Sequence, residues 1–508
     1  MTATLTAIPC LIYHAYPIAI CTVLILGILP RVLHALLSPV RQIPGPFLAR
    51  FTRLWYFRQV IRGDFDQVNI QLHRRYGPIV RIAPNEYSFE DLQAIKTIYG
   101  HGTKFAKAPW YNASGVPSKH PRMNLFTDRN MKNHADNRRK VANLYSMTAL
   151  LKMEPSVDSC IEIVLQRFDE FASSKQSINM HHWLQCYAFD VIGLITFSRR
   201  FGFLDEGEDI EEIMKSIHNF LHYSALVGIY NEWHKYIFGL IVMVGFKGMK
   251  NIVAFSLDRI NRNNDRDKGE GELEEDFLSK ALALHRAAPD RFSMGDVIST
   301  CTSNVGAGSD TTGISLSSIL YYLIRNPLTL RKLRAEIEGE SQRGTVSNPI
   351  TFQEAQRMPY LQAVIKESLR LHPATGLPLA RVVPAAGAVI AGTRFPGGTI
   401  VGVNTWVAHA NASVFGDDVR TFRPERWLED DETTSMLNKF WMPFGVGSRT
   451  CIGKNISLLE ISKLIPELIR RYDFQLIGMN SGLETQNVWF VKPTNFFCKI
   501  TKREPSGL

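Results

Sequence analysis

The stretch FGVGSRTCIG at residues 444–453 is the most informative part of this sequence, because it surrounds one thiol, that of Cys451, with residues suited to a metal-bound sulfur. A thiolate bound to haem iron needs shielding, backbone N–H donors and room for a flat macrocycle. Gly447 and Gly453 let the backbone approach closely, and Phe444 can pack beside the sulfur. Arg449 can reach a haem propionate. The pattern predicts Cys451 as the axial ligand of a haem iron; a buried, inert cysteine in a glycine-rich turn is the alternative.

The residues after Cys451 have a helical period from Ile452 to Arg471, which would aim the first amides of that helix at the sulfur. Every fixed position of the pattern Phe-x-x-Gly-x-Arg-x-Cys-x-Gly is present. This pattern is the haem-thiolate signature of the cytochrome P-450 family, which the chain therefore resembles. The resemblance implies the P-450 fold, mainly α-helical with a smaller β region, and haem b (iron protoporphyrin IX) as cofactor.

The longest predicted helix begins near Ser293, where Asp296 can complete a capping box, and ends at Arg325. Its middle, residues 304–313, is crowded with poor helix formers, and each glycine costs up to about 1 kcal/mol relative to alanine. This segment can therefore open locally and leave room for O2 and water beside the iron. A simple kink in a packed helix is the alternative.

Four residues in this helix carry predicted roles. Ala307 and Gly308 are small enough to border the space for oxygen. Thr311 can donate a hydrogen bond to bound oxygen, and Asp310 can relay protons. The run AGSDTT at 307–312 also fits the oxygen-binding motif of the central helix of the P-450 family.

The pattern Glu-x-x-Arg is a weak signal here because it occurs at Glu340, Glu354, Glu367 and Glu467. The copy at Glu367 is followed, in the order that the family uses, by HP at 372–373, PLAR at 378–381 and FRPERW at 422–427. The resemblance then implies a buried structural triad of Glu367, Arg370 and Arg426, which steadies the loop that carries Cys451.

The two propionates of a haem would need cations or hydrogen-bond donors from several segments. Arg449 and Arg381 match propionate-binding positions of the family. His134-x-x-x-Arg138 corresponds to a helix in which the family usually has Trp-x-x-x-Arg. His134 departs from that pattern, although a histidine N–H can still donate to a carboxylate. A plain solvated helix is the alternative for this segment.

The amino terminus has an unusual distribution of charge: no Lys or Arg precedes Arg31, and no Asp or Glu precedes Asp64. Residues 11–29 are apolar and nearly long enough to span a membrane. The arginines on the carboxyl side favour an anchor helix, with the catalytic body in the cytosol, over a cleaved signal peptide. We predict an anchor at 1–30, a basic proline-rich hinge at 31–50 and a catalytic domain at 51–508. The resemblance to microsomal members implies the endoplasmic reticulum membrane.

The composition is that of a large folded protein, since 45% of the 508 residues are hydrophobic and 21% are charged. The seven cysteines form no CxxC or His/Cys cluster, so neither a disulfide framework nor a zinc site is predicted. The net charge of +10 fits nucleic acid, an anionic membrane or an acidic protein as partner. We favour the last two because no nucleic-acid motif occurs.

The predicted activity is monooxygenation of a lipophilic small molecule with O2. The sequence has no Rossmann glycine pattern or flavin domain, so the resemblance implies NADPH-derived electrons from a separate NADPH-cytochrome reductase and its flavins, with cytochrome b5 as a further candidate donor. Residues 188–205 and 451–460 resemble fungal members related to pisatin demethylase, which implies secondary metabolism. The predicted apolar walls of the substrate site are Phe105, Trp110, Tyr111, residues 220–246, Val305, residues 375–379, Trp489 and Phe490.

Two other function classes stay open. A haem-thiolate isomerase or dehydratase would need no O2 and often lacks the acid–alcohol pair that Asp310 and Thr311 provide. A non-catalytic haem sensor would not need that pair. Substrate-dependent consumption of NADPH with a reductase would separate the three classes.

Overall fold

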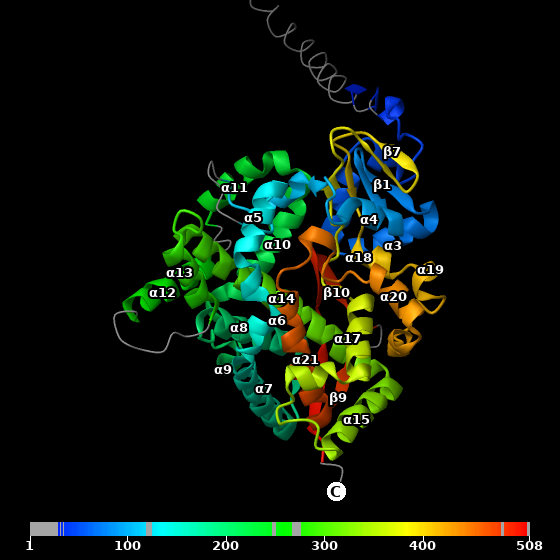
Figure 1. Ribbon diagram of the computed structural model, residues 1–508. Helices are drawn as coiled ribbons and strands as arrows, with labels where there is room; N and C mark the ends of the chain where they lie inside the picture. Colours follow the sequence, from blue (N-terminus) through cyan, green and yellow to red (C-terminus); the bar gives the residue numbers. More distant parts are fainter. Residues whose placement is uncertain are drawn as a thin grey trace, which may run out of the picture.

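The computed structural model describes residues 29–30, 32–33, 35–117, 124–245, 250–266, 276–478 and 482–504. They form a mainly helical body with a smaller region of strands, as predicted (Figure 1). The central helix α14 (Met294–Arg325) and the helix that follows Cys451, α21 (Lys454–Arg471), lie in the middle of this body.

The other helices surround these two. In chain order they are α2 (Leu54–Arg62), α3 (Phe65–Tyr76), α4 (Leu92–Tyr99), α5 (Met131–Val141), α6 (Met147–Leu151), α7 (Glu154–Ser174), α8 (Met180–Phe197), α9 (Phe203–Glu206), α10 (Ile213–Ile229), α11 (His234–Met243), α12 (Lys250–Arg266), α13 (Phe277–Ala287), α15 (Pro327–Gln342), α16 (Phe352–Gln356), α17 (Pro359–Leu371), α18 (Thr405–His409), α19 (Ala412–Phe415) and α20 (Asp431–Phe440).

The largest sheet has the strand order β1 (Ile79–Ala83), β2 (Glu86–Phe89), β8 (Ile400–Gly402), β5 (Arg381–Val382) and β3 (Ala106–Lys107). The remaining strands form one three-stranded sheet and two hairpins: β4 (Ser177–Asn179), β12 (Phe497–Lys502) and β9 (Tyr472–Ile477); β6 (Ala388–Ile390) with β7 (Thr393–Phe395); and β10 (Thr485–Val488) with β11 (Phe490–Pro493). Residues 79–89 alternate like one strand but form the antiparallel pair β1–β2, because Pro84 and Asn85 make a turn between them.

Helix α14 begins at the predicted capping box. The Ser293 N–H donates to the Asp296 carboxylate at 2.8 Å, and the Asp296 N–H donates to the Ser293 hydroxyl at 3.3 Å. The predicted local opening is not present, since residues 294–325 form one continuous helix. The hydroxyl of Thr311 donates to the Ala307 carbonyl at 2.9 Å, as several other hydroxyls in α14 do four residues back.

Two glycines of α14 let it approach α8 closely. A Cβ at Gly308 would lie 3.2 Å from Ile192 Cδ1, and a Cβ at Gly313 would lie 3.0 Å from Gln185 Cα. Both glycines therefore serve the packing of the two helices.

The predicted anchor at residues 11–29 lies outside the described residues, except for Leu29. Across the helices that the structure describes, we find none with the length and apolar character needed to cross a bilayer. Part of the predicted hinge packs on β1, where the Arg81 N–H donates to the Pro44 carbonyl at 2.8 Å. A Cβ at Gly45 would lie only 2.3 Å from the Arg81 carbonyl oxygen, so this contact requires glycine.

Candidate functional site

The loop of Cys451 is held by its own backbone and by α4. The Cys451 N–H donates to the Phe444 carbonyl at 2.8 Å, which closes the loop. Gly447 has φ +69°, and a Cβ there would lie 1.7 Å from the Tyr99 carbonyl oxygen at the end of α4. No side chain fits at position 447, so this glycine fixes how closely the loop approaches α4.

Cys451 is accessible, whereas the other cysteines in the described part of the chain are buried. The low-polarity surroundings of the sulfur raise the pKa of the Cys451 thiol, and the amides of Gly453 and Lys454 and the Arg138 guanidinium oppose this rise. These amides stand at the start of α21, as the sequence predicted for the helix after Cys451. A thiolate ligand is stabilised by such donors, and metal coordination would remove the thiol proton.

A cavity of about 490 Å³ opens beside this loop. Four residues predicted to bind propionates line it, although they come from distant parts of the chain: His134, Arg138, Arg381 and Arg449. Helix α5 supplies the first two, β5 the third and the Cys451 loop the fourth. The structure therefore brings the whole predicted propionate set to one cavity.

The cavity is strongly cationic. Burial, and then Arg381, lower the pKa of Arg449 to about 10, and one buried Arg449 nitrogen, Nη2, has no hydrogen-bond partner among the described residues. Burial, and then the charges of Arg449 and Lys107, lower the pKa of His134 to about 3. Neutral His134 can donate a ring N–H to an anion. Among the described residues no carboxylate lines this cavity, and its partly buried cations suit the two carboxylates of a haem, so the residues present fit this cofactor.

Lys107 lies close to the cavity cations Arg381 and Arg449, and it was not predicted from the sequence. Its ammonium group is buried 4.7 Å from the Tyr111 ring centre and 2.5 Å from the Phe126 carbonyl oxygen. Burial, and then Arg381 and Arg449, lower the pKa of Lys107 well below its ordinary value. The pairing of β3 with β5, which brings Lys107 opposite Arg381, joins segments far apart in sequence and leaves no local pattern.

The predicted oxygen-side residues lie on different faces of α14. Ala307 is exposed and Thr311 is half-buried, so both are accessible. Asp310 is fully buried and points toward α8 and β11, where it contacts Gln185 and Lys492. Gly308 faces α8, as described above. The structure thus places the acid away from the accessible alcohol, and no pattern in the sequence indicated Gln185 or Lys492.

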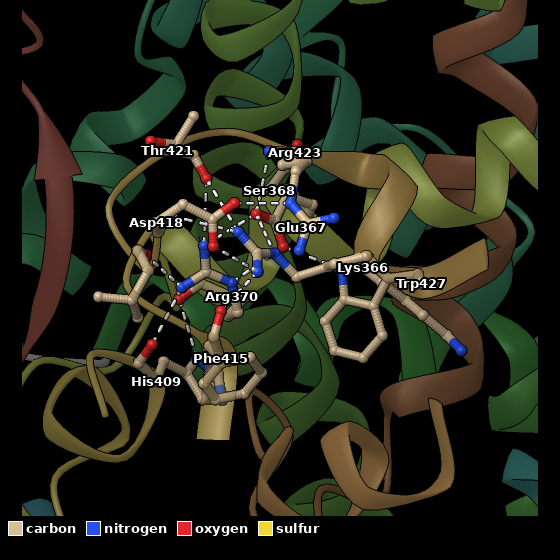
Figure 2. Close-up of polar contacts among 12 residues, drawn as sticks. Lys366, Glu367, Ser368, Arg370, His409, Phe415, Asp418, Thr421, Arg423 and Trp427 are labelled. Atoms are coloured by element: carbon tan, nitrogen blue, oxygen red, sulfur yellow. Dashed lines mark hydrogen bonds and ion pairs between the residues drawn. The ribbon is translucent and has the colours of Figure 1, made fainter. Parts of the chain in front are cut away.

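The structure brings the predicted triad together in a fully buried site (Figure 2). Arg370 makes a two-pronged contact with the Glu367 carboxylate, at 2.9 and 2.8 Å, and Arg426 Nε donates to it at 2.9 Å. The Trp427 indole N–H donates to the same carboxylate at 2.9 Å. Both guanidinium groups also bind backbone carbonyls in the segment between α18 and Trp427. The triad therefore fixes this segment onto α17.

His409 connects the triad to the Cys451 loop. The Arg370 guanidinium donates to the His409 carbonyl at 3.0 Å, and the His409 ring Nδ1 lies 2.9 Å from the Arg370 carbonyl oxygen. The Met442 N–H donates to Nε2 at 2.9 Å, two residues before Phe444. Nδ1 therefore carries the proton, and His409 must be neutral. Burial, and then the Arg370 charge, lower the pKa of His409 from about 6.5 to about 3.

Comparison with known proteins agrees with this geometry. Residues 44–498 match the family model described as Cytochrome P-450. A pisatin demethylase of Fusarium vanettenii is 41% identical over 466 residues, which cover 90% of this chain and 88% of that protein. The cytochrome P-450 monooxygenase cicH of Emericella nidulans is 37% identical over 472 residues, covering 91% of this chain and 93% of that one.

We expect Glu367→Gln to lower the free energy of unfolding by about 3–5 kcal/mol. It leaves buried Arg370 without its counter-charge, and it leaves Arg426 with only the Asp418 carboxylate, at 3.2 Å. The matched control is Glu340→Gln, which removes a carboxylate from the same Glu-x-x-Arg pattern on α15, where Arg343 is exposed. Urea unfolding of the haem-loaded proteins measures both changes. A loss in Glu367→Gln as small as that in Glu340→Gln would contradict the role of the triad.

The neutral state of His409 makes stability depend on pH. The folded-state pKa of about 3 lies below the ordinary value of 6.5, so the contribution of His409 is complete above pH 6.5 and declines as pH falls toward 3. At pH 5 the contribution of His409 to the free energy of unfolding is about 2 kcal/mol smaller than at pH 7. The free energy of unfolding of His409→Gln, measured at pH 5 and pH 7, should therefore differ between the two pH values by about 2 kcal/mol less than that of the unsubstituted chain. Exposed His101→Gln is the control, and equal pH dependence in all three proteins would disprove this linkage.

Proposed function

The chain belongs to the cytochrome P-450 family and is a haem-thiolate monooxygenase, and we propose that it oxidises a lipophilic small molecule of fungal secondary metabolism with electrons from a separate NADPH-dependent reductase. The observation that carries this proposal is that accessible Cys451 belongs to the loop whose residues Val446, Ser448 and Arg449 line the cationic cavity. Nothing in the structure or the comparisons favours an isomerase, a dehydratase or a haem sensor.

The chain's own residues would hold the cofactor and deliver protons. Cys451 would bind the iron, and Arg138, Arg381, Arg449 and His134 would bind the propionates. Thiolate-bound haem supplies O2 activation and transfer of one oxygen atom to substrate. The Thr311 hydroxyl, bonded to the Ala307 carbonyl at 2.9 Å, would turn to donate its proton at the accessible face of α14. Asp310, at the preceding position of the same helix, would resupply that proton.

Aromatic side chains support a lipophilic substrate. Two segments that the sequence predicted as substrate walls meet in the structure, where the ring centres of Trp110 and Trp489 lie 4.8 Å apart. Phe126 lies 4.8 Å from Trp489 and 5.1 Å from Tyr111, so four rings form one cluster. Such a cluster binds flat apolar molecules by contact area and ring stacking. The similarity to fungal monooxygenases supports a secondary metabolite as substrate.

Electron delivery would use the side of the Cys451 loop that carries Lys454. Its ammonium group lies 5.8 Å from the Phe444 ring centre. Burial, and then the Lys454 charge, lower the pKa of neighbouring Lys366. These lysines would attract the acidic surface of a reductase or of cytochrome b5, with an association rate that falls as salt rises.

Membrane association is supported by exposed apolar side chains that follow the predicted anchor, namely Leu33, Leu36, Leu37, Phe47 and Leu48. The connection between α10 and α11 lies beside this segment, since Arg53 donates to the Ile229 carbonyl at 2.7 Å and pairs with Glu232. Exposed Trp233 and Tyr236 extend the apolar surface. We place these side chains against the endoplasmic reticulum membrane, with residues 11–29 as the anchor and the body in the cytosol.

Two measurements on the purified full chain test the proposed function. We expect the ferrous carbon monoxide complex to show the red-displaced Soret band of a thiolate ligand, and Cys451→Ser to lose it. We also expect consumption of NADPH that requires both reductase and a lipophilic compound selected by its shift of the ferric Soret band. An isomerase, a dehydratase or a sensor would show the first property without the second.

We expect Thr311→Ala to lower the product formed per NADPH by about tenfold or more, with hydrogen peroxide released instead, because the proton donor is lost. Thr302→Ala is the matched control, since its hydroxyl makes the same bond four residues back on α14, to the Ile298 carbonyl at 2.7 Å. Peroxide and product are measured against NADPH for both variants. Equal coupling in the two proteins would remove Thr311 from the proton route.

A further inference from the structure

The turn of the β10–β11 hairpin holds Trp489 in an uncommon backbone conformation. Val488 of β10 pairs with Phe490 of β11, so Trp489 is the single residue between the paired ones. Its φ is +86°, in a region that bulky side chains rarely occupy and that strains the backbone. Such a conformation persists only where the surrounding structure fixes it, and it is found most often at binding and active sites.

The side chain of buried Asn487 fixes this turn, together with the backbone of Gly376. The Trp489 N–H donates to Asn487 Oδ1 at 3.1 Å, and the Gly376 N–H donates to the Trp489 carbonyl at 2.8 Å. Asn487 Nδ2 donates to the Gly376 carbonyl at 3.1 Å. Gly376 also makes room for this amide, because a Cβ there would lie 2.3 Å from Nδ2. Both backbone polar groups of Trp489 are therefore bound within one small site.

Asp66 of α3 holds the Asn487 amide in place. Asn487 Nδ2 donates to Asp66 Oδ1 at 2.9 Å, and both residues are only 1% exposed. Gln67 donates to Asp66 Oδ2 at 3.0 Å. Burial raises the pKa of Asp66 to about 6, although the Asn487 and Gln67 amides oppose this rise. The Asn487 amide thus donates both of its hydrogens and accepts one, which fixes its orientation and joins α3 to the turn.

The backbone of the turn decides where the Trp489 ring lies. The ring centre is 4.8 Å from that of Trp110, with the planes at 83°, and 4.8 Å from that of Phe126. Gly228 of α10 accommodates Trp110 in turn, since a Cβ there would lie 2.4 Å from its Cδ1. Because φ sets the direction of the Cα–Cβ bond relative to the preceding peptide, a turn relaxed to negative φ would carry the Trp489 indole away from this cluster.

We propose that Asn487, held by Asp66, is a positioning residue for substrate binding, which keeps Trp489 in its strained turn and so fixes one wall of the aromatic cluster. This inference rests on the proposed role of that cluster in binding the lipophilic substrate. A ring that is held before the substrate arrives need not be ordered on binding, so the affinity depends on the residues that hold it. No pattern in the sequence indicated a part in substrate selection for Asp66 or Asn487.

Binding to the haem-loaded full chain is measured by titrating the ferric Soret band with the lipophilic compound selected by its Soret shift. We expect Asn487→Ala to raise the dissociation constant about tenfold, because the Trp489 ring is no longer held before binding. In the Trp489→Ala background the same substitution should have no further effect, since the ring on which it acts is missing. Asn404→Ala is the matched control, because buried Asn404 also donates to the Gly376 carbonyl, at 3.0 Å, and accepts from the N–H of a tryptophan two residues on, Trp406, at 3.0 Å.

Substitutions of Asp66 give a second test, which also serves if Asn487→Ala does not bind haem. Asp66→Ala should weaken binding in the same way, whereas Asp66→Asn should preserve it, because its amide oxygen still accepts from Asn487. The inference alone is overturned if Asn487→Ala and Asp66→Ala change the dissociation constant no more than Asn404→Ala. An equal loss in Asp66→Asn, or a further loss in the Trp489→Ala background, also overturns it. If Trp489→Ala itself leaves the dissociation constant unchanged, the proposed aromatic site fails.

Discussion

The position of Cys451 depends on one buried carboxylate, that of Glu367. Two guanidinium groups and an indole N–H bind it, and the same guanidinium groups bind the backbone of the segment before the Cys451 loop. His409 continues this network to Met442, at the start of the loop. Each member is buried, so loss of any one leaves a charge or a donor without a partner. The network therefore holds the loop in place without touching the sulfur.

Buried charge is treated in three different ways in this molecule. The Glu367 site is neutralised and fully hydrogen-bonded within the chain, which suits a permanent structural element. The pair of Asp310 and Lys492 is also neutralised, by a single ion contact between α14 and β11. The cationic cavity around Arg449 has no carboxylate among the described residues and fits an external dianion. The degree to which the chain itself balances a buried charge thus separates the structural network from the binding site.

Helix α14 owes its two ends to local sequence and the continuity of its polar middle to tertiary packing. The capping box and the helix ends follow from residues close in sequence, and the structure has them as predicted. The glycines do not open the helix, because α8 packs against them and fills the space that their missing side chains leave. The local opening that helix propensity alone predicted is therefore absent, because contacts that only the folded chain provides offset the cost of the glycines.

The sequence by itself determined the family, the helix that follows Cys451 and the capped central helix, and it predicted the sulfur ligand and the arginines that would bind propionates. These follow from residues within one motif, or from a pattern that a haem requires. Only the tertiary structure decided which cation joins the cavity, which face of α14 carries the acid, and what holds that acid. Lys107, Gln185 and Lys492 belong to elements far from the motifs they serve. Buried charges are balanced by whichever segments the fold brings together, and no spacing along the chain records that choice.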